Sequence, residues 1–155
     1  MDAPRFTIYV DADACPARDE VLWVCRRHAL IPVFVANAPI LAIANSSYAK
    51  MEVVTGDFDA ADNWIVEQAV TGDLVLTSDL LLAQRAVKKV ISALNFSGQQ
   101  FTENLIHDLV AQRGVQQLLR EMSLPSHRPA TYGKQDRSHF KDALHRWIEA
   151  RKRQG

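Results

Sequence analysis

Five short apolar runs alternate with helix-like segments along this chain, and this alternation limits its possible folds more than any other feature. The runs are rich in β-branched and aromatic residues, as buried strands are. The expected strands are residues 6–10, 31–37, 51–55, 73–77 and 89–94. Strands that alternate with helices form a parallel sheet with helices on both faces. The sequence therefore predicts an α/β fold, a three-layer α/β/α sandwich around a mostly parallel five-stranded sheet.

Helix signals fill the intervals between these runs. Pro16 suits the first turn of a helix that ends near His28, with Cys15 close to its N-cap. Asp59 and Thr102 are candidate N-caps further along, and Gly114 is a candidate break in the helix that follows Thr102. The expected helices are residues 16–28, 59–70, 79–88, a segment that begins after residue 102, and residues 136–152. Residues 38–50 and 123–135 are expected to be loops, the first with one helical turn.

The composition predicts one compact domain that spans residues 1–155. A chain of 155 residues with 48% apolar residues can bury a real core. No apolar run reaches the length of a transmembrane helix, and the N-terminus lacks the pattern of a secretory signal. The two cysteines would lie on one helix roughly 15 Å apart, too far for a disulfide. A reduced, cytoplasmic location is therefore expected.

The net charge is zero, but the charges are unevenly distributed. Residues 1–80 carry 12 acidic and 5 basic residues, whereas residues 126–155 carry 3 acidic and 8 basic residues. An acidic half and a basic tail suit a metal site beside a groove for a polyanion. A solvated helix end explains the basic tail equally well, and the sequence leaves both interpretations open.

Carboxylates follow two of the expected strands at the point where each strand ends. Asp11 and Asp13 come directly after the first strand, Asp79 follows the fourth, and Asp62 lies one turn into the helix before the fourth. In open α/β sheets, ligands bind beyond the carboxyl ends of the strands. Residues two apart in extended backbone point to the same side, so Asp11 and Asp13 are expected to act together.

Clustered carboxylates raise one another's pKa unless a cation lies between them. Mg²⁺ and Mn²⁺ prefer oxygen ligands, and such an ion can activate a water for phosphodiester hydrolysis. The four aspartates are therefore candidate catalytic residues and metal ligands. Structural roles remain open: Asp59 and Asp79 also suit helix caps, and Asp62 suits the first turn of a helix. Cys15 is interpreted as structural, because the sequence CPAR lacks a second cysteine.

Several sequence blocks together resemble the YaiI/YqxD family of uncharacterised bacterial proteins, which has a PIN-like fold. The blocks are VDADACP (10–16), VAN (35–37), GDFDAADNWI (56–65), GDLVLTSDLLLA (72–83), FTENLI (101–106) and KQDRSHF (134–140). The resemblance implies a single PIN-like domain. It also implies that Asp11, with Asp13 beside it, Asp62 and Asp79 occupy the positions at which PIN nucleases hold their metal ion.

The same blocks supply the residues expected to bind a substrate. These residues are Asn37, Thr77, Ser78, Lys134 and Arg137. Two departures from the family pattern stand out. The family usually has Arg-Gly after the Asn that follows the fifth strand, whereas this chain has Phe96 and Ser97. The usual Ile-Pro after the TxD aspartate is replaced by Leu80 and Leu81.

The leading functional hypothesis is a nuclease that uses Mg²⁺ or Mn²⁺ to cleave RNA or single-stranded nucleic acid. The basic residues Arg146, Arg151, Lys152 and Arg153 are expected to extend its contact with phosphates. One alternative is a non-catalytic module of the same fold that binds nucleic acid or protein. A less favoured alternative is a haloacid-dehalogenase-like phosphatase, which also has D-x-D after its first strand. No cap domain fits that alternative, and GDFDAAD precedes the TSD strand rather than following it.

Overall fold

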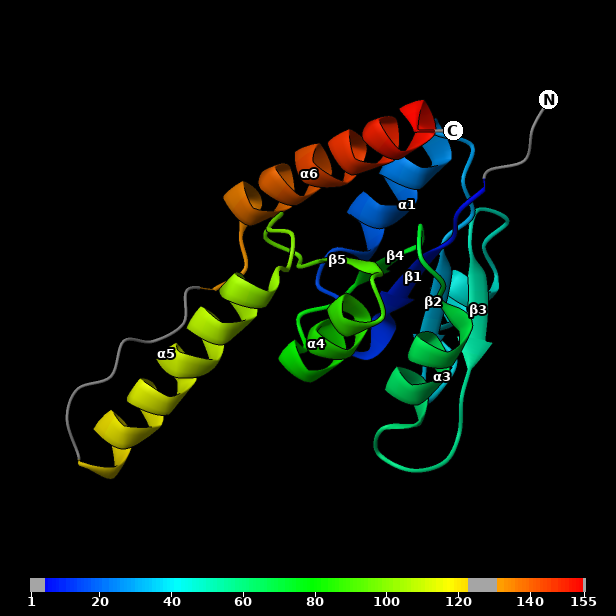
Figure 1. Cartoon of the computed structure of the whole chain (residues 1–155). Coiled ribbons are helices and arrows are strands. Elements are labelled where there is room, and N and C mark those ends of the chain that lie inside the picture. Colours follow the sequence, from blue (N-terminus) through cyan, green and yellow to red (C-terminus); the bar gives the residue numbers. More distant parts are fainter. Residues whose placement is uncertain (1–4, 123–130, 155) are drawn as a thin grey trace.

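A five-stranded parallel sheet lies at the centre of the protein (Figure 1). The computed structural model describes residues 5–122 and 131–154. The strands are β1 (Ile8–Asp11), β2 (Val33–Ala36), β3 (Lys50–Val53), β4 (Leu74–Leu76) and β5 (Ser92–Leu94). Their order in the sheet is β3-β2-β1-β4-β5, and every neighbouring pair is parallel. The three-layer prediction is confirmed, and the sheet is wholly rather than mostly parallel.

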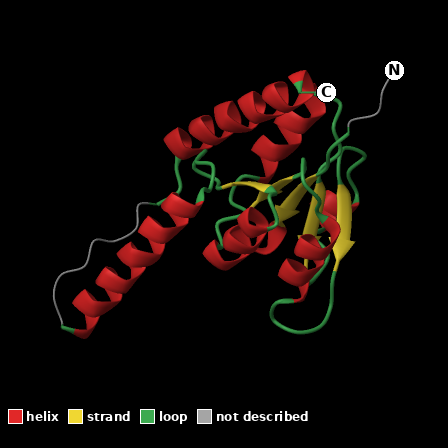
Figure 2. Cartoon of the chain, viewed as in Figure 1, coloured by secondary structure: helices red, strands yellow, loops and turns green. Residues whose placement is uncertain are grey.

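Helices cover both faces of this sheet (Figure 2). They are α1 (Arg18–Arg27), α2 (Leu41–Ala44), α3 (Ala60–Gln68), α4 (Leu80–Lys88), α5 (Glu103–Glu121) and α6 (Lys134–Arg153), with a short 3₁₀ helix, η1, at Ala12–Ala14. The core on one face joins the sheet to α1 and α6 through residues such as Val24, Phe34 and Phe140. The core on the other face joins it to α3 and α4 through residues such as Ile65 and Leu82.

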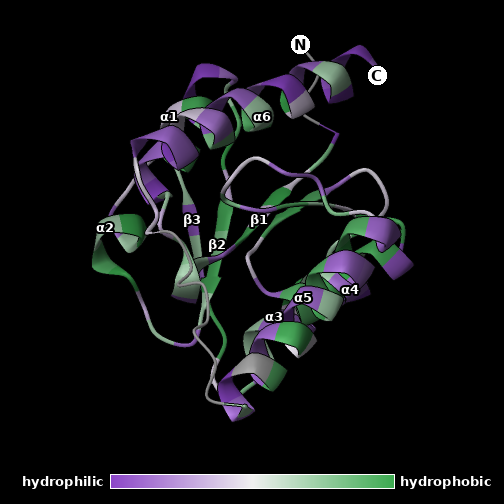
Figure 3. Cartoon of the chain, turned by 90° about the vertical axis from the view of Figure 1, so that its left-hand side faces the viewer, coloured by the Kyte–Doolittle hydropathy of each residue, from purple (hydrophilic) through white to green (hydrophobic). Residues whose placement is uncertain are grey.

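Alternate residues of β1 point into the two cores, as the two-residue period of a strand requires. Ile8 and Val10 belong to the core with α1 and α6, and Tyr9 belongs to the core with α3 and α4. Figure 3 shows the largely hydrophobic strands β1 and β2 in the interior and many hydrophilic residues along α1 and α6. Within the described residues, no helix is long and apolar enough to cross a membrane.

The helix boundaries differ from the expected ones near Cys15. The chain turns into η1 directly after β1, so α1 begins only at Arg18, and its N-cap is Ala17 rather than Cys15. Asp59 is the N-cap of α3, but its side chain accepts no capping hydrogen bond. The last helix begins at Lys134, two residues earlier than expected. Part of the predicted loop 123–135, residues 123–130, lies outside the described residues.

Helix α5 is continuous from Glu103 to Glu121, so the expected break at Gly114 is wrong. Thr102 caps it as predicted, because its hydroxyl oxygen accepts a hydrogen bond from the Leu105 backbone N–H at 3.1 Å. The first turns of α5 pack on the sheet through Ile106, whereas residues 111–118 are exposed. Figure 1 shows α5 extending away from the sheet beyond those turns.

Candidate functional site

The order of the strands places the predicted aspartates at the switch point of the sheet. The chain proceeds from β1 to β2 and β3 on one side and then returns to place β4 on the other side of β1. In open α/β sheets, the crevice beside such a reversal is the usual ligand site. Asp11 is the last residue of β1, and Asp79 lies three residues beyond the end of β4. The two aspartates therefore lie beyond the carboxyl ends of adjacent strands, at this reversal.

Asp11 is a buried carboxylate, with only 8% of its surface exposed. Its Oδ2 accepts a 2.8 Å hydrogen bond from the hydroxyl of Thr77, which is fully buried. Burial raises the pKa of Asp11, the Thr77 hydrogen bond partly offsets this rise, and the charges of Asp79 and Asp13 add to it. The site thus disfavours the charge of Asp11, as expected where a cation is to be bound or a proton retained.

Asp79 is held in place by the start of α4. Its Oδ1 accepts hydrogen bonds from the backbone N–H groups of Leu81 at 2.8 Å and Leu82 at 3.3 Å. Its own backbone N–H donates to the Thr77 hydroxyl oxygen at 2.9 Å. Thr77 therefore links Asp11 to Asp79, and one hydroxyl fixes the ends of two neighbouring strands. Asp79 is a helix cap, as one of the two open interpretations stated, and its Oδ2 accepts no hydrogen bond from the described residues.

Asp62 has the most perturbed carboxylate of the set. Burial raises its pKa from 3.8 to about 6, with additions from Asp11, Asp79 and Asp59, while Arg85 lowers it. Among the described residues, none donates a hydrogen bond to Asp62. Burial is the largest cause of the raised pKa and the like charges add to it, so the prediction that Asp62 lies near Asp11 and Asp79 is consistent with the electrostatics.

Asp13 differs from the other three aspartates, because it lies in the 3₁₀ helix η1 and is exposed. The prediction that Asp11 and Asp13 point the same way assumed extended backbone, but residues Ala12–Ala14 form η1, so that premise is wrong. Asp13 is exposed, and its Oδ2 accepts a 3.3 Å hydrogen bond from the backbone N–H of Asn37. Asn37 is also exposed, just past the end of β2. Asp13 and Asn37 thus form a pair at the rim of the site.

The donor chemistry of the cluster fits a hard divalent cation. Asp11, Asp13 and Asp79 each use one carboxylate oxygen in a hydrogen bond and retain the other, and Asp62 retains both. Within the described ranges, however, no three His, Cys, Asp or Glu side chains lie close enough to hold a metal ion together. Mg²⁺ commonly binds through one or two carboxylates, with waters and substrate phosphates completing its shell. The cluster therefore fits that mode, and it does not form a closed protein cage.

Of the residues expected to bind substrate, Ser78 is exposed at the crevice, but Thr77 is buried and already bonded to Asp11. Ser78 lines a cavity of about 450 Å³, together with Asn95 and Tyr132. Lys134 and Arg137 lie at the start of α6 and line a different cleft, between α1 and α6.

Arg137 is anchored rather than freely extended. It forms a 2.8 Å ion pair with Glu20, and it donates a hydrogen bond to the backbone carbonyl of Pro16 at 2.9 Å. Glu20 is mostly buried, and its Oε2 is unpaired. The ion pair fixes the guanidinium near the N-terminus of α1, a contact that no local sequence pattern predicts.

The predicted basic tail is also partly occupied by contacts within the fold. Arg151 donates to the backbone carbonyl of Gly72 at 3.1 Å and lies over the ring of Phe6. Lys152 donates to the backbone carbonyl of His28 at 3.1 Å. These two residues hold the end of α6 against the sheet and α1, so their contact with phosphates stays a prediction.

Comparisons with known proteins decide the family. The profile of the family described as "Uncharacterized BCR, YaiI/YqxD family" matches residues 9–150. The chain belongs to the YaiI/YqxD family. Among its curated relatives is a UPF0178 protein of Psychromonas ingrahamii, 41% identical over 149 residues, which are 95% of this chain and 98% of the relative. A UPF0178 protein of Rhodospirillum rubrum is 40% identical over 146 residues, which are 94% and 97% of the two chains. No solved structure gives a significant match.

The resemblance stated from the sequence is therefore confirmed at the level of the YaiI/YqxD family. One departure from the family pattern has a structural explanation in this member. Phe96, where the pattern has arginine, is 3% exposed and packs against Phe140 of α6, with their ring centroids 5.5 Å apart. An apolar contact with α6 thus replaces the expected cation. At the other departure, the two residues differ in burial: Leu80 is buried in the core, and Leu81 is exposed.

Proposed function

We propose that this protein is a divalent-metal-dependent hydrolase of phosphodiester bonds in RNA or other single-stranded nucleic acid. The observation that carries the proposal is the electrostatic coupling of three acids from different elements at the switch point of the sheet. Beyond the effect of burial, the charge of Asp79 adds to the raised pKa of Asp11, and the charges of Asp11 and Asp79 add to the raised pKa of Asp62. A fold that needed only caps and turns would not gather three acids here, because their repulsion opposes folding. Perturbed acids in a crevice are candidate functional groups.

One or two of the carboxylates of Asp11, Asp62 and Asp79 would bind a Mg²⁺ or Mn²⁺ ion, with waters and substrate phosphates completing its shell and Asp13 at the rim. When bound, the ion supplies an activated water and neutralises charge on a phosphate. The chain's own contribution is orientation. Thr77 fixes one oxygen of Asp11, and the backbone of α4 fixes one oxygen of Asp79. In the metal-free protein the pKa of Asp62 is about 6, and a bound cation would lower it and keep the carboxylate charged.

The test is cleavage of a fluorescently labelled single-stranded RNA in Mn²⁺ and in EDTA. Asp62→Asn is the most informative variant, because no described residue donates a hydrogen bond to that side chain. Changes even in outer-shell metal partners typically lower activity about 10–100-fold, so Asp62→Asn is expected to lower cleavage at least about 100-fold.

Glu67→Gln is the matched control, since Glu67 is exposed on the same helix, α3, and is not a source of the raised pKa of Asp62. It should cleave as the wild type does. The proposal fails if wild-type protein of high purity does not cleave in Mn²⁺, or if Asp62→Asn and Glu67→Gln cleave equally.

A non-catalytic nucleic-acid-binding module is the second candidate. The observation that favours it is that the described residues include no closed three-ligand metal group. This candidate predicts that RNA binds equally well in Mn²⁺ and EDTA and is recovered intact.

A further inference from the structure

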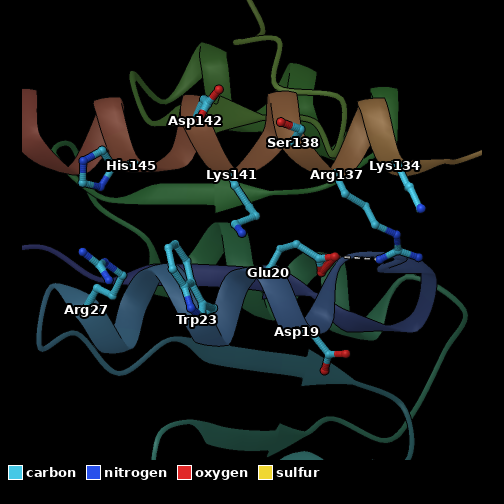
Figure 4. A pocket seen from close by; sticks show the side chains of 10 residues that line it. All are labelled: Asp19, Glu20, Trp23, Arg27, Lys134, Arg137, Ser138, Lys141, Asp142 and His145. Atoms are coloured by element: carbon cyan, nitrogen blue, oxygen red, sulfur yellow. Dashed lines mark hydrogen bonds and ion pairs between the residues drawn. The ribbon is translucent and has the colours of Figure 1, made fainter.

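A cleft of about 650 Å³ lies between α1 and α6 (Figure 4), and none of the four predicted aspartates lines it. Helix α1 contributes Trp23 and Arg27 to it, and α6 contributes Lys134, Arg137 and Lys141. In Figure 4 these side chains extend from the two helices into the space between them. The cleft therefore combines an aromatic side chain with several cations.

Trp23 is the most unusual of these residues, because half of its surface is exposed. Lys141 Nζ lies 4.1 Å from the centroid of its ring, and the Arg27 guanidinium carbon lies 4.9 Å from it. An exposed tryptophan beside cations is a common element of sites that bind single strands, because bases stack on the ring and phosphates contact the cations. Lysine and arginine side chains are flexible enough to move from the ring to a phosphate.

The charges of the cleft favour a polyanion on the α6 side. Lys134, Arg137 and Lys141 are spaced i, i+3 and i+7, so they share one face of α6 and span roughly 10 Å along it. Neither Lys134 nor Lys141 forms an ion pair with any described residue. Asp19, Glu20 and Asp142 also line the cleft, and Glu20 forms the ion pair with Arg137, so Lys134 and Lys141 are the two of these α6 cations without an acidic partner among the described residues. The α6 face is thus a short row of cations beside the Trp23 ring.

The cleft also approaches the switch point of the sheet. Arg137 lines the cleft and donates to the carbonyl of Pro16, and Pro16 lines the cavity that contains Ser78. The guanidinium of Arg137 lies 5.0 Å from the ring centroid of Tyr132, which lines that same cavity. Ser78 is adjacent to Asp79 in the chain. Residues suited to bases and phosphates therefore extend from Trp23 toward the aspartates.

We propose that the α1–α6 cleft is a subsite for single-stranded nucleic acid, in which an unpaired base stacks on Trp23 while Lys134 and Lys141 contact flanking phosphates. The choice of nucleic acid as the ligand rests on the proposed function. The subsite would hold a strand outside the acidic cluster, so its contribution is to binding and not to the chemical step.

The test measures binding alone, by fluorescence anisotropy in EDTA with two labelled 12-mers of equal charge. One is oligouridylate, and the other has the same sugar-phosphate backbone but no bases. Trp23→Ala is expected to weaken binding of oligouridylate about tenfold, because stacking on an aromatic side chain contributes that order per base. It should change the affinity for the abasic strand less than twofold. Lys141→Met should weaken both strands.

Tyr48→Ala is the matched control. Tyr48 is 46% exposed and has the guanidinium of Arg26 at 4.1 Å from its ring, yet it does not line the cleft. This variant should bind both strands as the wild type does. Trp23→Phe keeps an aromatic ring, so it should retain most of the affinity and guards against misfolding of the alanine variant.

The subsite is overturned if Trp23→Ala and Tyr48→Ala bind oligouridylate equally, if Trp23→Ala weakens both strands alike, or if the wild type binds neither strand. A different pattern would show that only the proposed nuclease activity is wrong. In that case Trp23→Ala would still weaken the binding of oligouridylate, but not of the abasic strand, in EDTA, while the wild type leaves RNA intact in Mn²⁺. Conversely, Asp62→Asn should lower cleavage without weakening the binding of oligouridylate in EDTA, because the change removes a negative charge.

Discussion

Single hydroxyl and carboxylate groups determine the character of the switch-point site. The Thr77 hydroxyl donates to Asp11 and accepts from the backbone N–H of Asp79, so both of its polar functions are used inside the protein. Asp62 has no such partner among the described residues, and its carboxylate remains the least satisfied. The roles of Asp62 and Thr77 can therefore each be tested by substituting that one residue.

The raised pKa of Asp62 predicts a specific dependence of stability on pH. In the folded protein its pKa is about 6 instead of 3.8. Between these values the folded chain holds a proton that the unfolded chain has released, so stability falls as pH rises across that interval. Asp62→Asn removes this loss, and its stability relative to wild type should increase from about pH 4 to about pH 6.5.

Urea unfolding of metal-free wild type, Asp62→Asn and the Glu67→Gln control at several pH values measures this dependence. Carbon-13 NMR should show the Asp62 carboxyl titrating with a midpoint of about 6. A midpoint near the ordinary aspartate value would mean that Asp62 is solvated and independent of Asp11.

The Thr77 hydroxyl is expected to stabilise the fold as well as the site. Thr77→Val keeps the shape of the side chain but leaves Oδ2 of the buried Asp11 without its hydrogen bond. An unsatisfied buried acceptor should lower the free energy of unfolding by about 1–3 kcal/mol. Because this hydrogen bond lowers the pKa of Asp11, the valine variant should also raise that pKa further. Urea unfolding measures the change in the free energy of unfolding. Thr77→Ser keeps the hydroxyl, so it should lower this free energy much less than Thr77→Val. Equal decreases in the two variants would show that the packing of the side chain matters and its hydrogen bond does not.

At the scale of elements, α6 determines the surface beside the site. Its apolar residues Phe140, Leu144 and Ile148 are fully buried in one core, and three of its cations, Lys134, Arg137 and Lys141, line the cleft beside α1. The turn after β5 approaches α6 so closely that a Cβ built on Gly98 would lie 2.7 Å from the backbone oxygen of His139. The position of α6 thus depends on a small residue at Gly98.

Two glycine substitutions should have opposite effects. Gly98 has φ of +90° and no room toward α6, so Gly98→Ala should lower the free energy of unfolding by at least about 1–3 kcal/mol. Gly114 lies inside α5, and a Cβ there would meet nothing within 4 Å. Gly114→Ala should stabilise the protein by about 0.5–1 kcal/mol, because alanine favours a helix interior over glycine. Thermal or urea unfolding of both variants tests this; a neutral Gly98→Ala would show that α6 can move away from the turn.

At the scale of the whole molecule, an acidic cluster at the strand ends and a basic helix, α6, lie on a single fold. Seven of the 20 residues of α6 are Lys or Arg, and three are Asp or Glu. The carboxylates at the ends of β1 and β4 instead repel one another, and this repulsion opposes folding. The stability of the whole chain should therefore respond to whatever neutralises these carboxylates.

Mn²⁺ or Mg²⁺ should stabilise the wild-type protein against thermal unfolding. At a hundredfold excess of ion over its dissociation constant, the gain is about 2.7 kcal/mol. Asp11→Asn should still fold, because its side-chain oxygen can accept the Thr77 hydrogen bond, and it should gain much less from the ion. Melting curves with Mn²⁺ and with EDTA measure both proteins. If Mn²⁺ shifts neither curve and Asp11→Asn is strongly destabilised, Asp11 is a structural residue and the metal proposal is wrong.

The sequence by itself determined the succession of elements and the strand ends at which Asp11 and Asp79 lie. These features follow from local periods of apolar residues and from caps such as Thr102, which act within a few residues of one another. The same local evidence failed at Asp13, because the chain leaves the extended conformation at Ala12, and at Gly114, where the rest of α5 outweighs one unfavourable residue.

Only the tertiary structure decided which distant groups meet. Thr77 bonds to Asp11 across 66 positions of the chain, and Arg137 pairs with Glu20 across 117. Such pairs depend on the order of strands in the sheet and on where α6 returns to α1, and no local pattern encodes them. The raised pKa of Asp62 and the cleft around Trp23 arise in the same way, because burial and neighbouring charge exist only once the elements have packed.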